Sequence, residues 1–175
     1  MAANPVTSLT LEDYHALYGN EHGYEYWFGE AVRKGLPTTL HGIMQGILVA
    51  LFKAAGYKTA TEVDLRIDPD WEPRPDVLVS AQPIQRPYPT SAEALTVIEV
   101  LSPDDAMPRV FQKCRNYVRV GITSIFVVDP EAHDAWEWSL ETDNTERIQV
   151  IRLPDGFTLP VSKVWEDLDR ELASE

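Results

Sequence analysis

One apolar segment with a single carboxylate inside it constrains the fold of this chain more than any other feature. The segment is Leu95-Thr96-Val97-Ile98-Glu99-Val100-Leu101. Because side chains alternate between the two faces of a strand, Glu99 shares a face with Val97 and Leu101. The opposite face is also mostly apolar, which predicts a strand buried on both sides. A carboxylate in such a place needs a cation, a hydrogen-bond partner or a proton.

The residues after this strand predict a β-α-β unit. A helix is expected from about Asp105 to Val120, closed by Gly121, and a strand from Ser124 to Asp129. A crossover of this kind joins parallel strands, so the strands around Glu99 and Ser124 are predicted neighbours. The order of elements predicts an α/β core, in which helices flank a mixed central β-sheet. The length of 175 residues suits one domain over 1–175.

Hydrophobic patterning and turn residues predict the other elements of the chain. The expected helices are a short opening one with Thr10 as its N-cap, one over about 40–55, and a terminal one over 161–172. A β-hairpin is expected within 24–32, turning at Gly29. Further strands are expected over 59–67 and 76–80 with 68–73 as the turn between them, and over 135–140 and 148–153 as a closing antiparallel pair.

Charge and cysteine content limit the partners and the compartment. The net charge of -13 disfavours a broad nucleic-acid surface, although Arg109, Lys113, Arg115 and Arg119 form one local basic cluster. A solvated helix face would give the same pattern. The single Cys114 excludes an internal disulfide framework, and no apolar run is long enough to span a membrane. With no signal peptide evident, a cytoplasmic protein is expected.

Asp76 and Glu99 are the best candidates for a metal site. They are expected on neighbouring strands, and two carboxylates that converge at a sheet suit a hard cation such as Mg²⁺ or Mn²⁺. Such a metal can stabilise the charge that develops on a phosphodiester and can activate water. The structural alternative is that Asp76 caps a turn after Pro75 while Glu99 forms a buried ion pair.

Three further residues could complete this site. Lys113 borders the apolar face of its predicted helix, so its stem could lie along the sheet and bring the ammonium to the carboxylates. Spacing alone equally describes a surface lysine. Glu30 follows the hairpin glycine and could add a metal contact through water. His41 begins an apolar helix and could bind phosphate or shuttle a proton, or serve a structural role.

Taken together, these segments resemble the Uma-two family of restriction-endonuclease-like proteins. The matching pieces occur in the family order from about Tyr14 to Leu168. They are Tyr24-Glu25 to Gly29-Glu30, His41, Pro75-Asp76-Val77, Ile98-Glu99-Val100-Leu101-Ser102-Pro103, Lys113 with Tyr117 and Gly121, and Val127-Val128-Asp129-Pro130. The resemblance implies a divergent PD-(D/E)XK nuclease core, with Asp76 as the aspartate of the first motif and Glu99 as the acid of the second.

The chain departs from this pattern at three positions. The superfamily's lysine two residues after the acid is Leu101 here, and the resemblance implies that Lys113 has taken its role from the next helix. An acidic residue common four positions before that lysine is Arg109. An aspartate usual before the hairpin glycine is Phe28.

Three functional hypotheses follow. The first is a Mg²⁺- or Mn²⁺-dependent DNA endonuclease, with Asp76 and Glu99 as ligands; a homodimer would suit cleavage of both strands. The second is a non-catalytic binding or assembly protein that keeps the nuclease fold. Its apolar surface for pairing subunits would come from Trp71, Trp136, Trp138 and the loop over 83–89. The third is a metal-dependent hydrolase of a small phosphoester.

Overall fold

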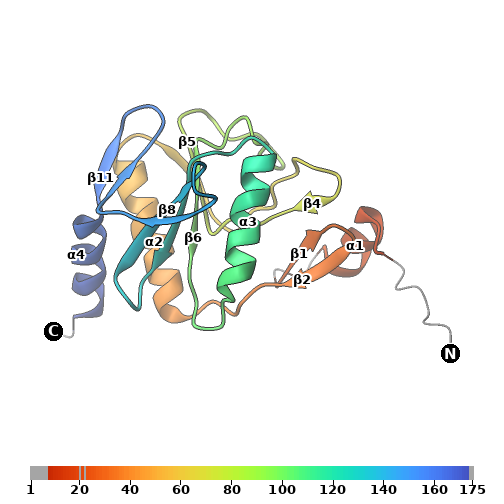
Figure 1. Cartoon of the computed structure of the whole chain (residues 1–175), viewed down its shortest axis with the longest axis horizontal. Coiled ribbons are helices and arrows are strands. Elements are labelled where there is room, and N and C mark those ends of the chain that lie inside the picture. The colour runs from red at the N-terminus through yellow and green to blue at the C-terminus, as the bar shows by residue number, and fades with distance from the viewer. Residues whose placement is uncertain (1–7, 20, 22, 174–175) are drawn as a thin grey trace.

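The computed structural model describes residues 8–19, 21 and 23–173. Its helices are α1 (Leu11–Tyr18), α2 (Thr39–Ala54), α3 (Met107–Arg119) and α4 (Val161–Leu172). Its strands are β1 (Tyr24–Trp27), β2 (Glu30–Arg33), β3 (Lys58–Ala60), β4 (Trp71–Glu72), β5 (Val77–Ser80), β6 (Thr96–Val100), β7 (Ile125–Asp129), β8 (Asp134–Ser139), β9 (Asn144–Arg147), β10 (Val150–Arg152) and β11 (Thr158–Pro160). Figure 1 shows the sheet lying between helices, with α1 and the β1–β2 hairpin at one end.

A mixed six-stranded sheet forms the centre of the molecule. Its strand order is β3-β5-β6-β7-β8-β9, and β6 and β7 are its parallel pair. This confirms the predicted β-α-β unit, because α3 connects these two strands. All five residues of β6 are buried, as the apolar composition on both of its faces predicts.

Each face of the sheet carries its own hydrophobic core. Ile98 and Val100 of β6 pack on the side of α2 and α4. Val97 packs on the side of α3, against Val110 and Cys114. Alternation therefore sends Glu99 toward α3, the face that the sequence predicts for it.

A smaller sheet of order β2-β1-β4 lies beside α1. The predicted hairpin forms around Phe28 and Gly29, and both have a positive φ, at 48° and 88°. A side chain at Gly29 would collide with Ser8, since an added Cβ would lie 1.9 Å from its Oγ. The predicted opening helix also forms, with Thr10 as its N-cap. The Thr10 side chain accepts from the backbone N–H of Asp13, and the Asp13 side chain accepts from the backbone N–H of Thr10.

Three predictions about the β segments differ from the structure. Strand β3 ends at Ala60 instead of continuing to residue 67, because the left-handed backbone of Glu62 (φ 53°) interrupts the extended conformation. The predicted turn over 68–73 contains β4, which pairs with β1. The predicted closing pair is also wrong: β8 pairs with β9 through a tight turn at Asp143 (φ 50°), and β10 pairs instead with β11.

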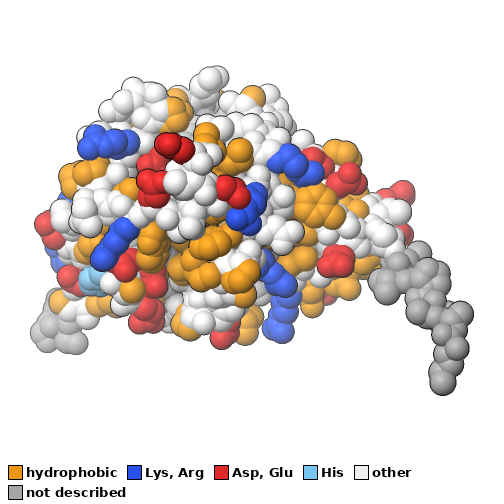
Figure 2. Space-filling model, viewed as in Figure 1, with side chains coloured by type: hydrophobic (Ala, Val, Ile, Leu, Met, Phe, Trp, Pro, Cys, Tyr) orange, Lys and Arg blue, Asp and Glu red, His pale blue; other side chains and the backbone are white. Residues whose placement is uncertain are grey.

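The surface differs from expectation at the tryptophans. Trp71 and Trp138 are buried, so neither contributes the apolar surface that was predicted for pairing subunits. On the face drawn in Figure 2, acidic and basic side chains are interspersed. Among the described residues, the structure has no helix with the length and apolar character that crossing a bilayer requires.

Candidate functional site

A buried lysine joins two carboxylates on the α3 side of the central sheet. Lys113 is only 7% exposed, and its Nζ donates to Glu25 Oε1 at 2.8 Å and to Glu99 Oε2 at 2.9 Å. A third bond reaches the Arg74 carbonyl oxygen at 3.2 Å. Since an ammonium has three N–H donors, Lys113 has all of its donors engaged. The structure thus excludes the surface alternative for Lys113 and contains the predicted ion pair of Glu99.

Both carboxylates at Lys113 are fixed by further partners. The Tyr117 hydroxyl donates to Glu99 Oε1 at 2.7 Å, and this tyrosine lies one turn after Lys113 on α3. Glu25 on β1 accepts from the backbone N–H of Arg74 and from the Trp27 indole N–H, each at 2.8 Å. These two acids are therefore held in place by elements from three parts of the chain.

Asp76 lies just before β5 and is positioned by the neighbouring strand. Its Oδ2 accepts from the backbone N–H of Val100 on β6 at 2.7 Å. Its Oδ1 accepts from Lys34 Nζ at 3.1 Å. Lys34 follows β2 and also donates to Glu62 Oε2 at 2.6 Å. The lysine and the sheet thus fix one carboxylate oxygen each.

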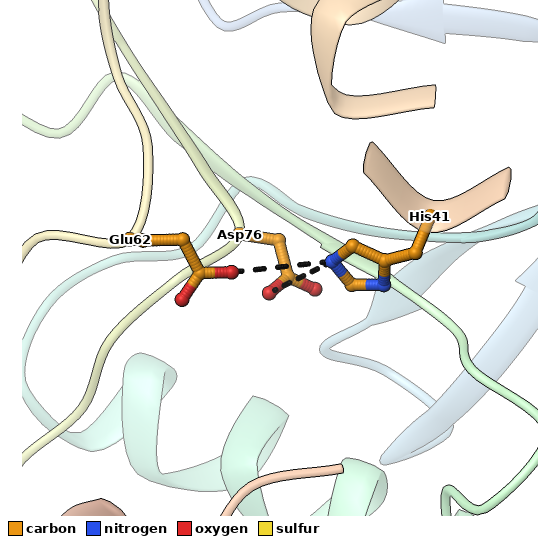
Figure 3. A group of neighbouring side chains, drawn as sticks. All are labelled: His41, Glu62 and Asp76. Atoms are coloured by element: carbon orange, nitrogen blue, oxygen red, sulfur yellow. Dashed lines mark ion pairs between the residues drawn. The ribbon is translucent and has the colours of Figure 1, made fainter. Parts of the chain in front are cut away.

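His41, Glu62 and Asp76 form a group that could hold a metal ion. One ligand atom from each lies within 4.8 Å of the other two. Figure 3 shows the imidazole pointing between the carboxylates, with Nε2 at 3.6 Å from Asp76 Oδ1 and 3.9 Å from Glu62 Oε1. This nitrogen is buried and makes no hydrogen bond within the described part of the chain. Nδ1 lies 3.1 Å from Ser102 Oγ, which orients the ring.

The position of Glu62 is reinforced from α2. Gln45 lies one turn after His41, and its amide donates to Glu62 Oε1 at 3.0 Å and to the Asp76 carbonyl at 3.1 Å. The left-handed backbone of Glu62 is costly for a residue with a long side chain. The surrounding contacts offset this cost and hold a carboxylate beside His41.

A cavity of about 430 Å³ opens onto these groups. Glu25, Asp76, Glu99, Lys34, Lys113 and His41 all line it. At its mouth lie the exposed side chains of Arg33, Leu36 and Arg109. The volume is of the size that small-molecule and cofactor sites occupy in proteins.

Carboxylates outnumber lysines in and beside the cavity. Four carboxylates (Glu25, Glu62, Asp76 and Glu99) face the two ammonium groups of Lys34 and Lys113. Two negative charges therefore remain when every acid is ionised and His41 is neutral. A divalent cation or bound protons would neutralise this excess.

The pKa values follow from this imbalance. Burial raises the pKa of Glu99 to about 7, because repulsion from Asp76 and Glu25 adds to it and outweighs the attraction of Lys113. Burial also acts on Asp76, but Lys34 and His41 hold its pKa well below the usual range. Burial opposes protonation of His41, yet the adjoining Asp76 carboxylate raises its pKa.

The donor set fits a divalent metal ion. Carboxylate oxygens suit Mg²⁺ and Mn²⁺, and an imidazole nitrogen extends the range toward Mn²⁺ and softer ions. In the neutral tautomer that carries its proton on Nδ1, His41 donates to Ser102 Oγ, and the lone pair on Nε2 faces the two carboxylates. The buried Nε2 makes no hydrogen bond among the described residues and faces two carboxylates, an arrangement that a bound cation or a proton on this nitrogen would satisfy.

Comparison with known families identifies the chain at this point. A family model named Uma2 and described as "putative restriction endonuclease" matches residues 11–173. The chain belongs to the Uma2 family. This confirms the Uma-two resemblance drawn from the motifs.

Solved structures support the same fold for this Uma2 protein. It is similar to a crystal structure of a "putative nuclease belonging to DUF820" from Anabaena variabilis, at a TM-score of 0.75 and 18% identity. The alignment covers 91% of this chain and 99% of that one. The fold is therefore restriction-endonuclease-like, with helices on both faces of a mixed sheet. No curated protein matches the chain.

The Uma2 fold brings four of the five predicted site residues to one cavity. Asp76, Glu99, Lys113 and His41 all line it, although they come from β5, β6, α3 and α2 or their ends. Glu30 is exposed and does not line it. The hairpin turn places Glu30 opposite Trp27 at the tip of the strand pair, away from the other acids.

Sequence reasoning missed three residues of this site or gave them too little weight. Glu25 lies in an aromatic strand, and a carboxylate in such a strand is a signal of the same kind as Glu99. Glu62 was expected within a regular strand, where its left-handed backbone has no place. Lys34 carries no distinguishing sequence signal, since it lies in an irregular segment whose path depends on the fold.

The basic cluster predicted on α3 is not one surface. Lys113 is buried. Arg115 pairs with Asp143, and Arg119 pairs with Asp68. Only Arg109 of the four lines the cavity mouth together with the buried lysine beneath it.

Proposed function

We propose that this Uma2 protein is a Mg²⁺- or Mn²⁺-dependent DNA endonuclease, built as one restriction-endonuclease-like domain over 1–175. One observation carries the proposal: the carboxylates of Glu25, Asp76 and Glu99 line one cavity with His41, whose buried Nε2 makes no hydrogen bond to any described residue, and Glu62 lies beside Asp76 and His41. Membership of a restriction-endonuclease family supports DNA as the substrate.

Asp76 is the central ligand of the proposed site. It lies between His41 and Glu62 on one side and lines the same cavity as Glu99 on the other. A bound divalent ion would neutralise charge on the scissile phosphate and lower the pKa of water. We assign Asp76 and Glu99 as ligands, as the motifs imply, and add His41 and Glu62 to that shell.

Lys113 acts as a positioning residue in this proposal. Its three donors are engaged by Glu25, Glu99 and the Arg74 carbonyl, so none is directed at a substrate. Its charge keeps the two glutamates close together despite their repulsion. Tyr117 completes this support from the same helix.

The mouth of the cavity offers contacts for a nucleic-acid backbone. Arg33 and Arg109 are both exposed there, and Arg109 Nη1 donates to the Arg33 carbonyl at 3.3 Å. Guanidinium groups bind phosphate oxygens well. With a net charge of -13 the chain lacks a strong general attraction for DNA. Binding is therefore expected to be weak and to need the metal ion and these arginines together.

Cleavage of both DNA strands in one binding event would be served by a second active site. We propose that two copies of the chain act together on duplex DNA. Sedimentation of the protein with a duplex and Ca²⁺, a cation that seldom supports hydrolysis, should reveal two protein chains per duplex. A complex with one chain would contradict the pairing of two copies on the duplex.

The proposal is tested with supercoiled, linear and single-stranded DNA in Mg²⁺ or Mn²⁺. Asp76→Asn should lower the cleavage rate by at least about a hundredfold, because a ligand at the centre of the site is lost. Asp70→Asn, at an exposed turn, is the matched control and should cleave like wild type. Glu99→Gln serves as the second variant if Asp76→Asn does not fold. Equal cleavage by wild type and both site variants would refute the assignment.

One observation favours the alternative of a non-catalytic binding or assembly protein. The four carboxylates already have cationic or hydrogen-bonding partners within the described chain. A network of this kind can persist as a structural element of the fold. This role predicts no metal binding and no cleavage of any DNA. A small-phosphoester hydrolase would instead cleave a generic phosphodiester and leave DNA intact.

A further inference from the structure

The side chain of Lys34 lies where a metal ion would contact the acids. Its Nζ is 2.6 Å from Glu62 Oε2 and 3.1 Å from Asp76 Oδ1, and it also donates to the Arg74 carbonyl at 3.2 Å. The side chain is 16% exposed. These two carboxylates are also the acids of the metal-binding group with His41.

The ammonium and a metal ion would compete for the same oxygen. Asp76 Oδ1 is the atom that Lys34 contacts and also the atom nearest to His41 Nε2, at 3.6 Å (Figure 3). Its other oxygen is taken by the backbone N–H of Val100. Two cations on one carboxylate oxygen repel strongly at such distances. Binding of a metal ion should therefore weaken the hold of the carboxylates on the ammonium.

Lys34 is better placed to move than Lys113. It lies beyond the end of β2, in the irregular segment that leads to α2, and it already lines the cavity. Lys113 is held on a helix and is more deeply buried. A lysine side chain has a flexible four-carbon stem, so its ammonium can relocate without movement of the backbone.

We propose that Lys34 is an internal counter-ion that is displaced by the metal. In the metal-free protein its ammonium holds Glu62 and Asp76 together. When a divalent cation binds beside His41, the ammonium moves into the cavity, where it can contact a substrate phosphate. This inference rests on the metal site of the proposed function. It gives that site a cation for the substrate, which Lys113 with its engaged donors does not supply.

Titration calorimetry of the full chain with Mn²⁺ tests the competition. Lys34→Met removes the charge and keeps a chain of similar length, and it should bind Mn²⁺ at least about tenfold more tightly than wild type. Lys163→Met is the control, because Lys163 pairs with Asp167 on α4 and should leave Mn²⁺ affinity unchanged. In the metal-free state, Lys34→Met should also unfold at a lower temperature, and saturating Mn²⁺ should remove that difference.

A second measurement on the wild-type protein tests displacement directly. Reductive methylation of lysine amines, mapped by mass spectrometry, should modify Lys34 faster when Mn²⁺ is saturating. Lys113 should stay protected in both states and is the internal control.

The outcomes separate this inference from the proposed function. Mn²⁺ binding with equal affinity in wild type and Lys34→Met, or unchanged methylation of Lys34, would overturn the displacement and leave the metal site standing. The absence of Mn²⁺ binding in both proteins would overturn the metal site and the displacement together.

Discussion

Glu99→Gln should change how the stability of the metal-free protein depends on pH. Burial, together with repulsion from Asp76 and Glu25, raises the pKa of Glu99 to about 7 in the folded state, from an ordinary value of 4.5. Between these values the folded protein binds a proton that the unfolded chain has released. Stability contributed by Glu99 is therefore complete below pH 4.5 and is lost as pH rises through about 7.

The size of this loss follows from the two pKa values. Each pKa unit between folded and unfolded states corresponds to about 1.4 kcal/mol, so the shift from 4.5 to about 7 gives a loss on the order of 3 kcal/mol. Glutamine cannot ionise, yet it fills the same space and can still accept from the Tyr117 hydroxyl. The loss with rising pH should therefore be absent from the variant.

Urea unfolding of wild type and Glu99→Gln, in chelator and at pH values from 4 to 9, measures the effect. The informative quantity is the change with pH in the difference between their unfolding free energies. The attraction of Lys113 for the ionised carboxylate is already part of the pKa of Glu99, so only the difference between protonated glutamic acid and glutamine remains, as an offset that varies little with pH. Wild type should lose about 3 kcal/mol relative to the variant across this range.

A metal ion should suppress the same loss. A divalent cation near Glu99 favours the ionised carboxylate and lowers its pKa, so saturating Mn²⁺ should flatten the pH dependence of the wild type. A difference between the two proteins that stays constant from pH 4 to 9 would refute the reasoning. It would mean that Lys113 compensates Glu99 fully and that the acids carry no uncompensated charge.

Three further substitutions test the packing of the site and of the fold. Lys113→Met should destabilise the protein by about 3–5 kcal/mol in urea unfolding, because it leaves buried carboxylates without their cation. Lys163→Met should have little effect. Tyr117→Phe should cost about 1.5–3 kcal/mol through the lost hydrogen bond to Glu99, and Mn²⁺ calorimetry should show weaker binding. Thr10→Ala should cost about 1 kcal/mol, measured by thermal unfolding, because it removes the capping box of α1.

The central part of the fold is predictable because its signals are local and mutually consistent. The apolar run around Glu99, the helix that follows it and Gly121 (φ 91°) at the end of that helix define the β-α-β unit. The pairing of the later β segments is less predictable, because the partner of a strand depends on turn geometry as much as on composition. The turn at Asp143 directs β8 to β9, and nothing in the apolar pattern of 148–153 indicates its actual pairing with β11.

Some residues of the candidate site are likewise predictable from local sequence, and others depend on how the elements pack. Asp76 and Glu99 are visible in the sequence because a carboxylate among buried strand residues is rare and costly. Lys113 cannot be assigned from the sequence alone, because its helical spacing fits a surface lysine as well as a buried one. Only the packing of α3 on the sheet shows that its ammonium lies between Glu99 and Glu25.

The family resemblance implies that Lys113 replaces a lysine expected two residues after Glu99. Leu101 occupies the position two residues after the acid, and alternation sends it to the same face of the sheet as Glu99. A lysine at that position would reach Glu99 from the strand itself, but here the ammonium arrives from α3 at 2.9 Å. The ammonium of Lys113 is buried and has three acceptors. In the proposed nuclease, Lys113 has no free donor for a substrate phosphate, and Lys34 is the lysine that lines the cavity in an irregular segment.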